Sequence, residues 1–194
     1  MLRSRRRVDR IGFVLAHRQP DLTVVIENVH DPHNVSAIFR SCDAVGVKQV
    51  ELLYTHEKFP RIGKKSSSSA NKWLDHRKHT SVEGCYEALR REGFVIYATH
   101  LGVNTLSLFA LDLTKKVALV FGNEHRGVSP EAAEKADANF QIPMVGMIQS
   151  LNVSVACAVS LYEALRQRLV HGDFDSVKLR DDELTSLQND WVKR

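Results

Sequence analysis

The sequence predicts an α/β domain with a mostly parallel sheet flanked by helices. The first observation is that strand patterns and helix patterns alternate along residues 21–170, as they do in chains that form parallel sheets. The second is a run of five apolar residues at 117–121, which is typical of a strand buried on both faces of such a sheet. The third is composition, because 194 residues with 43% hydrophobic and 26% charged side chains suit one globular domain of ordinary size.

Each element follows from its own pattern. Residues 22–26 are rich in β-branched side chains and predict a strand, whereas residues 34–45 carry apolar side chains at helical spacing. Residues 57–71 have the composition of a surface loop. Further strands are predicted at 47–54, 94–99, 117–121 and 140–144. Further helices are predicted at 81–91, with Ser81 as N-cap, at 129–136, with Pro130 at its first position, at 150–170 and at 181–193.

The chain is predicted to divide into a basic helical arm at 1–20, the α/β domain at 21–170 and a helical extension at 171–194. The first 18 residues carry six arginines and one acid, a net charge of +5 in a chain whose total is +4. A basic arm on a near-neutral body predicts contact with a polyanion, most often nucleic acid. A solvated helix face explains the charge alone equally well. The candidate nucleic-acid contacts are Arg3, Arg5, Arg6, Arg7, Arg10 and Arg18.

Cellular location is inferred from cysteine usage and hydropathy. Cys42, Cys85 and Cys157 lie far apart with no CxxC pair, which favours free thiols in a reducing compartment. The apolar stretch at 11–16 is too short for a signal peptide, and no apolar run approaches the ~20 residues that span a bilayer. We therefore expect a cytoplasmic protein with no membrane contact.

Three common signatures of nucleotide and metal sites are missing or incomplete. No Gly-X-Gly-X-X-Gly sequence follows a predicted strand, which weakens a dinucleotide-binding interpretation. Residues 63–66 imitate part of a phosphate-binding loop, but Lys58 stands where its first glycine belongs. Two histidine pairs lack a third ligand nearby, so we expect exposed histidines and no bound metal; these are His30 with His33, and His76 with His79.

Candidate site residues lie in the loops that follow strands, because ligands of parallel sheets bind outside the carboxyl ends of the strands. After the first strand come Asn34, near a helix start, and Arg40, six residues further on. Taken alone, these two residues are best explained as a helix cap and a surface arginine. The strand at 94–99 leads into polar residues at 99–100, and the strand at 117–121 leads into Gly122 and the carboxylate of Glu124. Taken alone, that last loop is an ordinary βα turn with polar caps.

The loop at 142–150 is the most unusual of the four. It contains proline, methionine, glycine and isoleucine but no charge before Ser150 and Asn152, which stand at the start of a buried helix. Ser150 is explained by helix capping, and a helix N-terminus also favours an anion. Capping does not explain the uncharged apolar loop, which suits packing around an apolar or aromatic ligand.

Three of these segments, in this order and spacing, resemble the motifs of the SPOUT RNA 2′-O-ribose methyltransferases. They are Asn34…Arg40, Phe121-Gly122-Asn123-Glu124-X-X-Gly127-Val128, and Ile142-Pro143-Met144…Ser150-Leu151-Asn152-Val153. The similarity covers residues 18–168 and is greatest to the bacterial members that methylate the D-loop guanosine at tRNA position 18.

The resemblance implies a deep trefoil knot in the C-terminal part of the domain and a homodimer with each site near the interface. It also implies S-adenosylmethionine as cofactor, bent into the knot and held mostly by backbone from three loops, and no protein partner is evident. By position, the expected cofactor contacts are Thr99, His100, Leu101, Gly122, Ile142, Met144 and Leu151.

Arg40 matches the family's arginine that is assigned to activating the ribose hydroxyl. Arginine keeps its proton in proteins (pKa above ~12), so we interpret its role as electrostatic, holding a phosphate and stabilising a developing 2′-alkoxide. The residues that the resemblance places around it are Asn34, Glu124, Ser150 and Asn152.

Two other functions stay open at this point. One is methylation of ribosomal RNA by the same chemistry, and the other is a non-catalytic RNA-binding dimer. A short arm and tail with no separate RNA-binding domain favour tRNA, and the presence of Arg40, Glu124 and Asn152 favours an enzyme.

Overall fold

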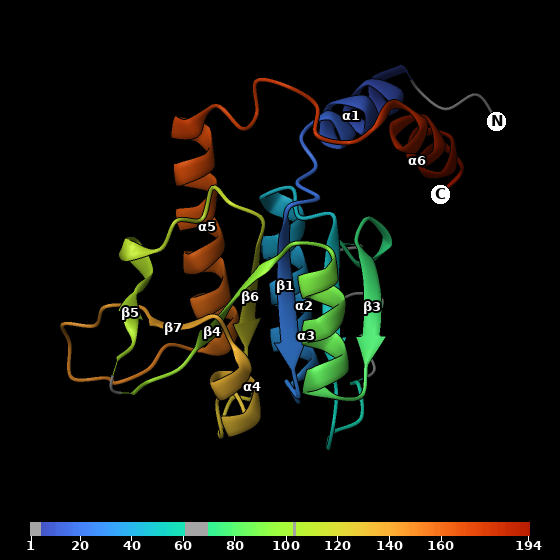
Figure 1. Ribbon diagram of the computed structural model, residues 1–194. Coiled ribbons are helices and arrows are strands. Elements are labelled where there is room, and N and C mark those ends of the chain that lie inside the picture. Colours follow the sequence, from blue (N-terminus) through green and yellow to red (C-terminus); the bar gives the residue numbers. More distant parts are fainter. Residues whose placement is uncertain (1–4, 61–69, 103) are drawn as a thin grey trace.

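The computed structural model describes residues 5–60, 70–102 and 104–194. A seven-stranded sheet with parallel pairings lies between helices (Figure 1), in the strand order β3-β2-β1-β6-β4-β7-β5. The predicted α/β class with a mostly parallel sheet is therefore confirmed. Residues 63–66 of the incomplete phosphate-binding pattern lie outside the described residues.

The elements have the following bounds. The strands are β1 (Leu22–Glu27), β2 (Gln49–Leu53), β3 (Asp75–His79), β4 (Val95–Thr99), β5 (Leu106–Ser107), β6 (Val117–Phe121) and β7 (Ala138–Gln141). The α-helices are α1 (Arg5–Ala16), α2 (Pro32–Ala44), α3 (Val82–Arg91), α4 (Pro130–Lys135), α5 (Val153–His171) and α6 (Asp181–Lys193). Two short 3₁₀ helices are η1 (Ala70–Lys72) and η2 (Leu108–Ala110).

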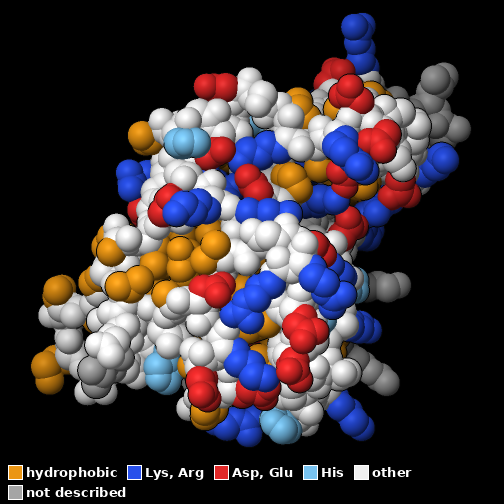
Figure 2. Space-filling view, in the orientation of Figure 1, with side chains coloured by type: hydrophobic (Ala, Val, Ile, Leu, Met, Phe, Trp, Pro, Cys, Tyr) orange, Lys and Arg blue, Asp and Glu red, His pale blue; other side chains and the backbone are white. Residues whose placement is uncertain are grey.

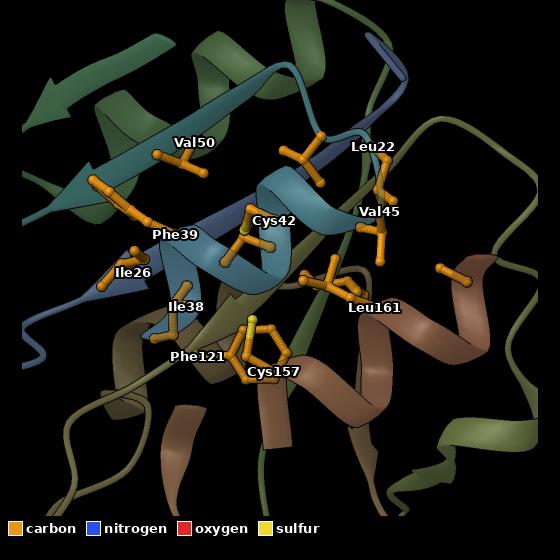
Figure 3. Close-up of a cluster of buried hydrophobic side chains, with 14 of the residues drawn as sticks. Leu22, Ile26, Ile38, Phe39, Cys42, Val45, Val50, Phe121, Cys157 and Leu161 are labelled. Carbon is orange, nitrogen blue, oxygen red and sulfur yellow. The ribbon is translucent and has the colours of Figure 1, made fainter. Parts of the chain in front are cut away.

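The centre of the sheet is buried on both faces. In β6, Leu119 and Phe121 pack on one side, whereas Ala118 and Val120 between them pack on the other, as the two-residue period of a strand requires. α2 and α5 cover the first side, where Cys42 and other side chains of the two helices meet the sheet (Figure 3). α3 and α4 cover the second side. The all-apolar sequence of β6 follows from this double burial.

Helix starts are set by small polar side chains. Ser81 accepts a hydrogen bond from the N–H of Gly84 and begins α3, and Ser129 accepts one from Ala132 and begins α4 ahead of Pro130. Both starts were predicted. Two other capping interpretations are wrong, because α2 is capped by Asp31 rather than Asn34, and α5 by Asn152 rather than Ser150.

Several boundaries and two strands differ from the prediction. β3 was missed because its sequence, DHRKH, has no apolar side chain, and β5 was missed because it has only two residues. β7 ends at Gln141 and not at residue 144. Part of the predicted loop at 57–71 is η1, and residues 61–69 lie outside the described residues.

α1 and α6 pack against each other beyond the amino ends of the strands (Figure 1). Ile11 and Leu15 of α1 form a small core with Leu179 and with Trp191 of α6. The amphipathic pattern of each helix thus reflects a shared apolar contact. The chain ends are held together at the side of the sheet opposite the loops that follow the strands.

Arg18 does not contact solvent, and its predicted role in RNA binding is wrong. Its side chain is 1% exposed, and its guanidinium donates to the carbonyl of Val47 at 2.8 Å and to Asp43 Oδ1 at 2.7 Å. The guanidinium also lies over the ring of Trp191, 5.1 Å from its centroid. Arg18 therefore joins the arm to α2 and α6, and its charge is already compensated within the chain.

Candidate active site

The loops after β4, β6 and β7 surround a cavity of about 570 Å³ at the carboxyl ends of the strands. Apolar side chains of Phe121 and Phe140 form part of its lining, and Glu124, Ser150 and Asn152 lie on its polar side. The seven residues expected to hold the cofactor all line this one cavity: Thr99, His100, Leu101, Gly122, Ile142, Met144 and Leu151.

The carboxylate of Glu124 joins the β6–α4 loop to the start of α2. It accepts hydrogen bonds from Asn34 Nδ2 at 2.9 Å and from the backbone N–H groups of His30 and Asp31, both at 3.1 Å. Burial acts to raise the pKa of Glu124, but these donated hydrogen bonds outweigh burial and lower the pKa below its ordinary value of 4.5. The carboxylate is therefore held ionised, and its oxygens are committed to fixed donors.

Asn34 and Asn152 extend this contact to the start of α5. Asn152 Nδ2 donates to Asn34 Oδ1 at 3.1 Å, while Asn152 Oδ1 accepts from the N–H of Ser154. An ionised carboxylate only accepts, so Glu124 fixes which end of the Asn34 amide faces it. The resulting chain, Asn152 to Asn34 to Glu124, joins residues of all three motifs although Asn34 and Asn152 are 118 positions apart.

Arg40 and Ser150 stand apart from this chain. Ser150 lies at the cavity and is exposed, with no hydrogen bond to any other described residue. Arg40 is exposed on α2, does not line the cavity, and forms no ion pair within the described part of the chain. Six residues of helix separate Arg40 from Asn34 by about 9 Å along the axis. The structure thus brings together Asn34, Glu124 and Asn152, places Ser150 at the cavity without a bond to them, and leaves Arg40 outside the cavity of its own subunit.

Gly122 lets the cavity wall turn tightly. A Cβ atom at this position would lie 2.1 Å from the backbone carbon of Gly127 and 2.2 Å from the nitrogen of Val128. The close approach is fixed by two backbone hydrogen bonds between Asn123 and Gly127. A side chain at position 122 would therefore displace the loop that carries Glu124.

Two asparagines that support the site were missed from the sequence. Asn28 has a left-handed backbone (φ 50°), and its Oδ1 accepts from the N–H of Thr55 at 3.0 Å. Asn123 Nδ2 donates to the carbonyl of Asn28 at 2.8 Å, and its Oδ1 accepts from the N–H groups of His125 and Arg126. Asparagine next to a strand end is the available signal, because it tolerates left-handed backbone and bonds nearby N–H groups.

The cavity suits an organic ligand with an aromatic part and polar ends. Apolar residues such as Phe121, Ile142 and Leu151 line it together with polar residues such as Asn123, Glu124 and Asn152. In residues 5–60, 70–102 and 104–194, no group of three or more His, Cys, Asp or Glu side chains is placed to hold a metal ion. Nor do those ranges contain a helix with the length and hydropathy that crossing a membrane requires.

Comparison with known proteins identifies the family. Residues 21–162 match the SpoU rRNA Methylase family, and the chain belongs to it. The chain is 44% identical over 192 residues to a tRNA (guanosine(18)-2′-O)-methyltransferase of Thermus thermophilus, covering 99% of this chain and 98% of the relative. It is also 44% identical over 162 residues to the enzyme of that name from Escherichia coli, covering 84% of this chain and 70% of the relative.

Solved structures agree. A tRNA modifying enzyme described as TrmH/SpoU from A. aeolicus superposes with a TM-score of 0.90 at 39% identity, covering 97% of this chain and 95% of that one. The SpoU methyltransferase AviRb from Streptomyces viridochromogenes, solved in complex with AdoMet, gives a TM-score of 0.70 at 29% identity, covering 80% and 61%. The resemblance inferred from three sequence motifs is confirmed.

Proposed function

We propose that this protein transfers a methyl group from S-adenosylmethionine to the ribose 2′-hydroxyl of guanosine 18 in the D-loop of tRNA. The observation that carries the proposal is the hydrogen-bonded chain Asn152–Asn34–Glu124 beside the cavity. Near full-length similarity to enzymes named for this reaction supports the choice of tRNA over ribosomal RNA.

The three loops around the cavity would hold the cofactor. When bound, it supplies a methyl group on a positively charged sulfur, which is already a good leaving group. Ile142, Met144 and Leu151 offer apolar surface to an aromatic ring, and the backbone of 99–101 offers polar groups. Gly122 keeps the opposite wall close. We place the loop at 142–152 in the trefoil knot that the family resemblance implies.

A second copy of the chain is proposed to complete the site. Val155, Tyr162 and Leu169 recur every seven residues on α5 and are 46%, 55% and 58% exposed. Hydrophobic side chains gather over α5 (Figure 2), and Val145 and Met147 in the preceding loop are fully exposed. Exposed apolar side chains gathered on one surface are typical of a protein–protein interface. A second copy seated there would explain why Arg40 lies outside the cavity of its own subunit.

The difficult part of the reaction is the weakly acidic 2′-hydroxyl. Arg40 of the second copy would hold a neighbouring phosphate and stabilise the 2′-alkoxide as it forms. Glu124 orients Asn34 rather than accepting the proton, because its lowered pKa and its hydrogen bonds make it a weak base. Ser150 and Asn152 then position the ribose, and the hydroxyl proton is lost to solvent.

The arm and the extension would hold the rest of the tRNA. Arg5, Arg6 and Arg10 are exposed on α1, and arginines that contact phosphates position RNA without reading its sequence. Arg7 is partly buried, with its guanidinium 5.9 Å from the ring of Trp73, and Arg3 lies outside the described residues. We propose that residues 1–20 and 171–194 act as one RNA-contacting unit beside the domain at 21–170. Three free, buried cysteines suit action in a reducing cytoplasm.

The direct test is to incubate the full chain with methyl-labelled cofactor and either a tRNA transcript or ribosomal RNA, and to map the labelled nucleotide. Label at guanosine 18 of tRNA is the expected result, with Arg40→Ala as the inactive control. Label confined to ribosomal RNA would contradict the substrate. RNA binding without any label would instead indicate a non-catalytic RNA-binding dimer.

A further inference from the structure

An ion pair that the proposed reaction does not use stands at the rim of the cavity. Arg126, in the β6–α4 loop, lines the cavity, and its Nη2 donates to Glu57 Oε1 at 2.7 Å. Glu57 follows β2, so the pair joins loops from two strands. His30 lies beside it, with Nδ1 3.7 Å from Glu57 Oε2, and its backbone N–H donates to Glu124. His30 thus connects the Glu57–Arg126 pair to the carboxylate of Glu124 in the proposed ribose site.

Two buried asparagines hydrogen-bond to the backbone beneath the pair. Asn28 Oδ1 accepts from the N–H of Glu57 at 3.4 Å, and Asn123 Oδ1 accepts from the N–H of Arg126 at 3.3 Å. Asn123 also donates to the carbonyl of Asn28, and the two asparagines are 6% and 8% exposed. Buried and mutually bonded amides therefore fix the backbone of both charged residues.

The pair itself is open. The side chain of Arg126 is 63% exposed and that of Glu57 is 29% exposed. An ion pair so exposed adds little to the stability of a fold. A contribution to stability therefore does not explain why this pair is present. Weak mutual attraction also means that a ligand with matching groups replaces the contact at little cost. A fixed backbone carrying a replaceable charge pair is a suitable arrangement for recognising a polar ligand.

We propose that Glu57 and Arg126 recognise the base of the guanosine that is methylated, an inference that rests on the proposed function. The Watson–Crick edge of guanine presents two donors, N1–H and the N2 amine, beside the acceptor O6. Glu57 accepts from the two donors, and Arg126 donates to O6. Adenine presents an unprotonated N1 to the carboxylate and an amine to the guanidinium, and both contacts are repulsive. The pair therefore selects guanine.

The test compares tRNA transcripts that carry guanosine, inosine or 2-aminopurine riboside at the methylated position. Inosine lacks the N2 amine, and 2-aminopurine lacks O6 and N1–H. The unaltered protein is expected to lose about 10- to 100-fold in kcat/KM with inosine. Glu57→Ala should lower kcat/KM for both nucleosides and remove the difference between them, so that the guanosine-to-inosine ratio falls to about 1. Arg126→Ala should keep the guanosine-to-inosine ratio and reduce the preference for guanosine over 2-aminopurine.

Glu131→Ala is the matched control, because Glu131 forms an exposed ion pair with Lys135 on α4; it should leave the rates and ratios unchanged. Cofactor binding and thermal unfolding of each variant show that a lost preference is not lost folding. A guanosine-to-inosine ratio in Glu57→Ala equal to that of the unaltered protein overturns the inference. If the unaltered protein methylates no tRNA transcript, the proposed function itself has failed.

Discussion

Two arginines at opposite ends of the sheet serve opposite purposes. At the amino ends of the strands, Arg168 has no exposed side-chain surface, and all five of its N–H groups donate to oxygens of the chain. At the carboxyl ends, Arg126 is 63% exposed and bonds one carboxylate. The first arginine holds elements together, and the second is available to a ligand.

Positive charge in a sequence therefore does not by itself indicate an RNA contact. Arg18 lies within the basic arm but is buried against Asp43, whereas Arg40 is the only lysine or arginine of α2 and is exposed. What separates the two classes is the set of oxygens that the fold brings to each guanidinium.

The largest effect is expected from removing Arg168. Arg168→Ala leaves Asp21 and three backbone carbonyls without their buried donor, and should lower the free energy of unfolding by about 3–5 kcal/mol. Urea denaturation measures this change in the free energy of unfolding. Arg166→Ala is the matched control, because Arg166 bonds Glu163 from an exposed position and should lower the free energy of unfolding far less. Equal losses from the two variants would contradict the structural role of Arg168.

Removing Arg40 should act on turnover and not on stability. Arg40→Ala is expected to reduce methylation at least about 10²-fold, because it removes the cation that we propose stabilises the alkoxide. Cofactor binding by calorimetry and urea unfolding should match those of the unaltered protein, since Arg40 bonds no other described residue. Substantial methylation by this variant would remove Arg40 from the chemistry.

The bonded state of Glu124 should show in the pH dependence of stability. The pKa of this carboxyl is lowered in the folded protein, so its contribution is present above pH 4.5 and is lost as the pH falls through the folded value. The free energies of unfolding of Glu124→Gln and the unaltered protein should therefore differ at pH 7 and converge in acid. Asn34→Ala, which removes one donor, should move that convergence towards pH 4.5. A pH-independent difference would show that Glu124 is not held ionised.

The arm is expected to give the smallest effect. Changing Arg5, Arg6 and Arg10 together to glutamine removes up to three phosphate contacts, so the slope of log K against log salt should fall in magnitude by about 2–3. tRNA-binding titrations between low and high salt measure it. Arg18 stays in this variant, because deleting the whole arm would also remove its buried contacts. An unchanged slope would show that the exposed arginines do not touch phosphates.

The sequence predicts the fold well where patterns are local. A run of five apolar residues identifies β6, and Ser81 and Ser129 mark helix starts, because a strand's burial and a helix's cap depend on adjacent residues. β3 escapes prediction because it pairs through its backbone while its side chains carry charge. The start of α5 is misplaced because Ser150 and Asn152 are both good caps, and packing chooses between them.

The candidate site is predictable only in part. Parallel strands bring the four loops to one edge, so convergence of the cofactor-contact candidates follows from the fold class. The Asn34–Glu124 bond spans 90 positions and the Asn34–Asn152 bond spans 118, and no periodicity reports contacts so distant. Family resemblance placed those residues together. Asn28 and Asn123 were missed because their side chains hydrogen-bond to the backbone of neighbouring loops.

The central claim, that two copies share each site, is tested most directly by a dimer in which each copy carries a different inactivating substitution. Arg40→Ala and Glu124→Ala are co-expressed with different affinity tags, and the mixed dimer is purified. If Arg40 serves the cavity of the other copy, one of the two sites contains no substitution, and the mixed dimer should recover roughly half of the unaltered turnover. A mixed dimer as inactive as either parent would place Arg40 in its own subunit's site and contradict the account.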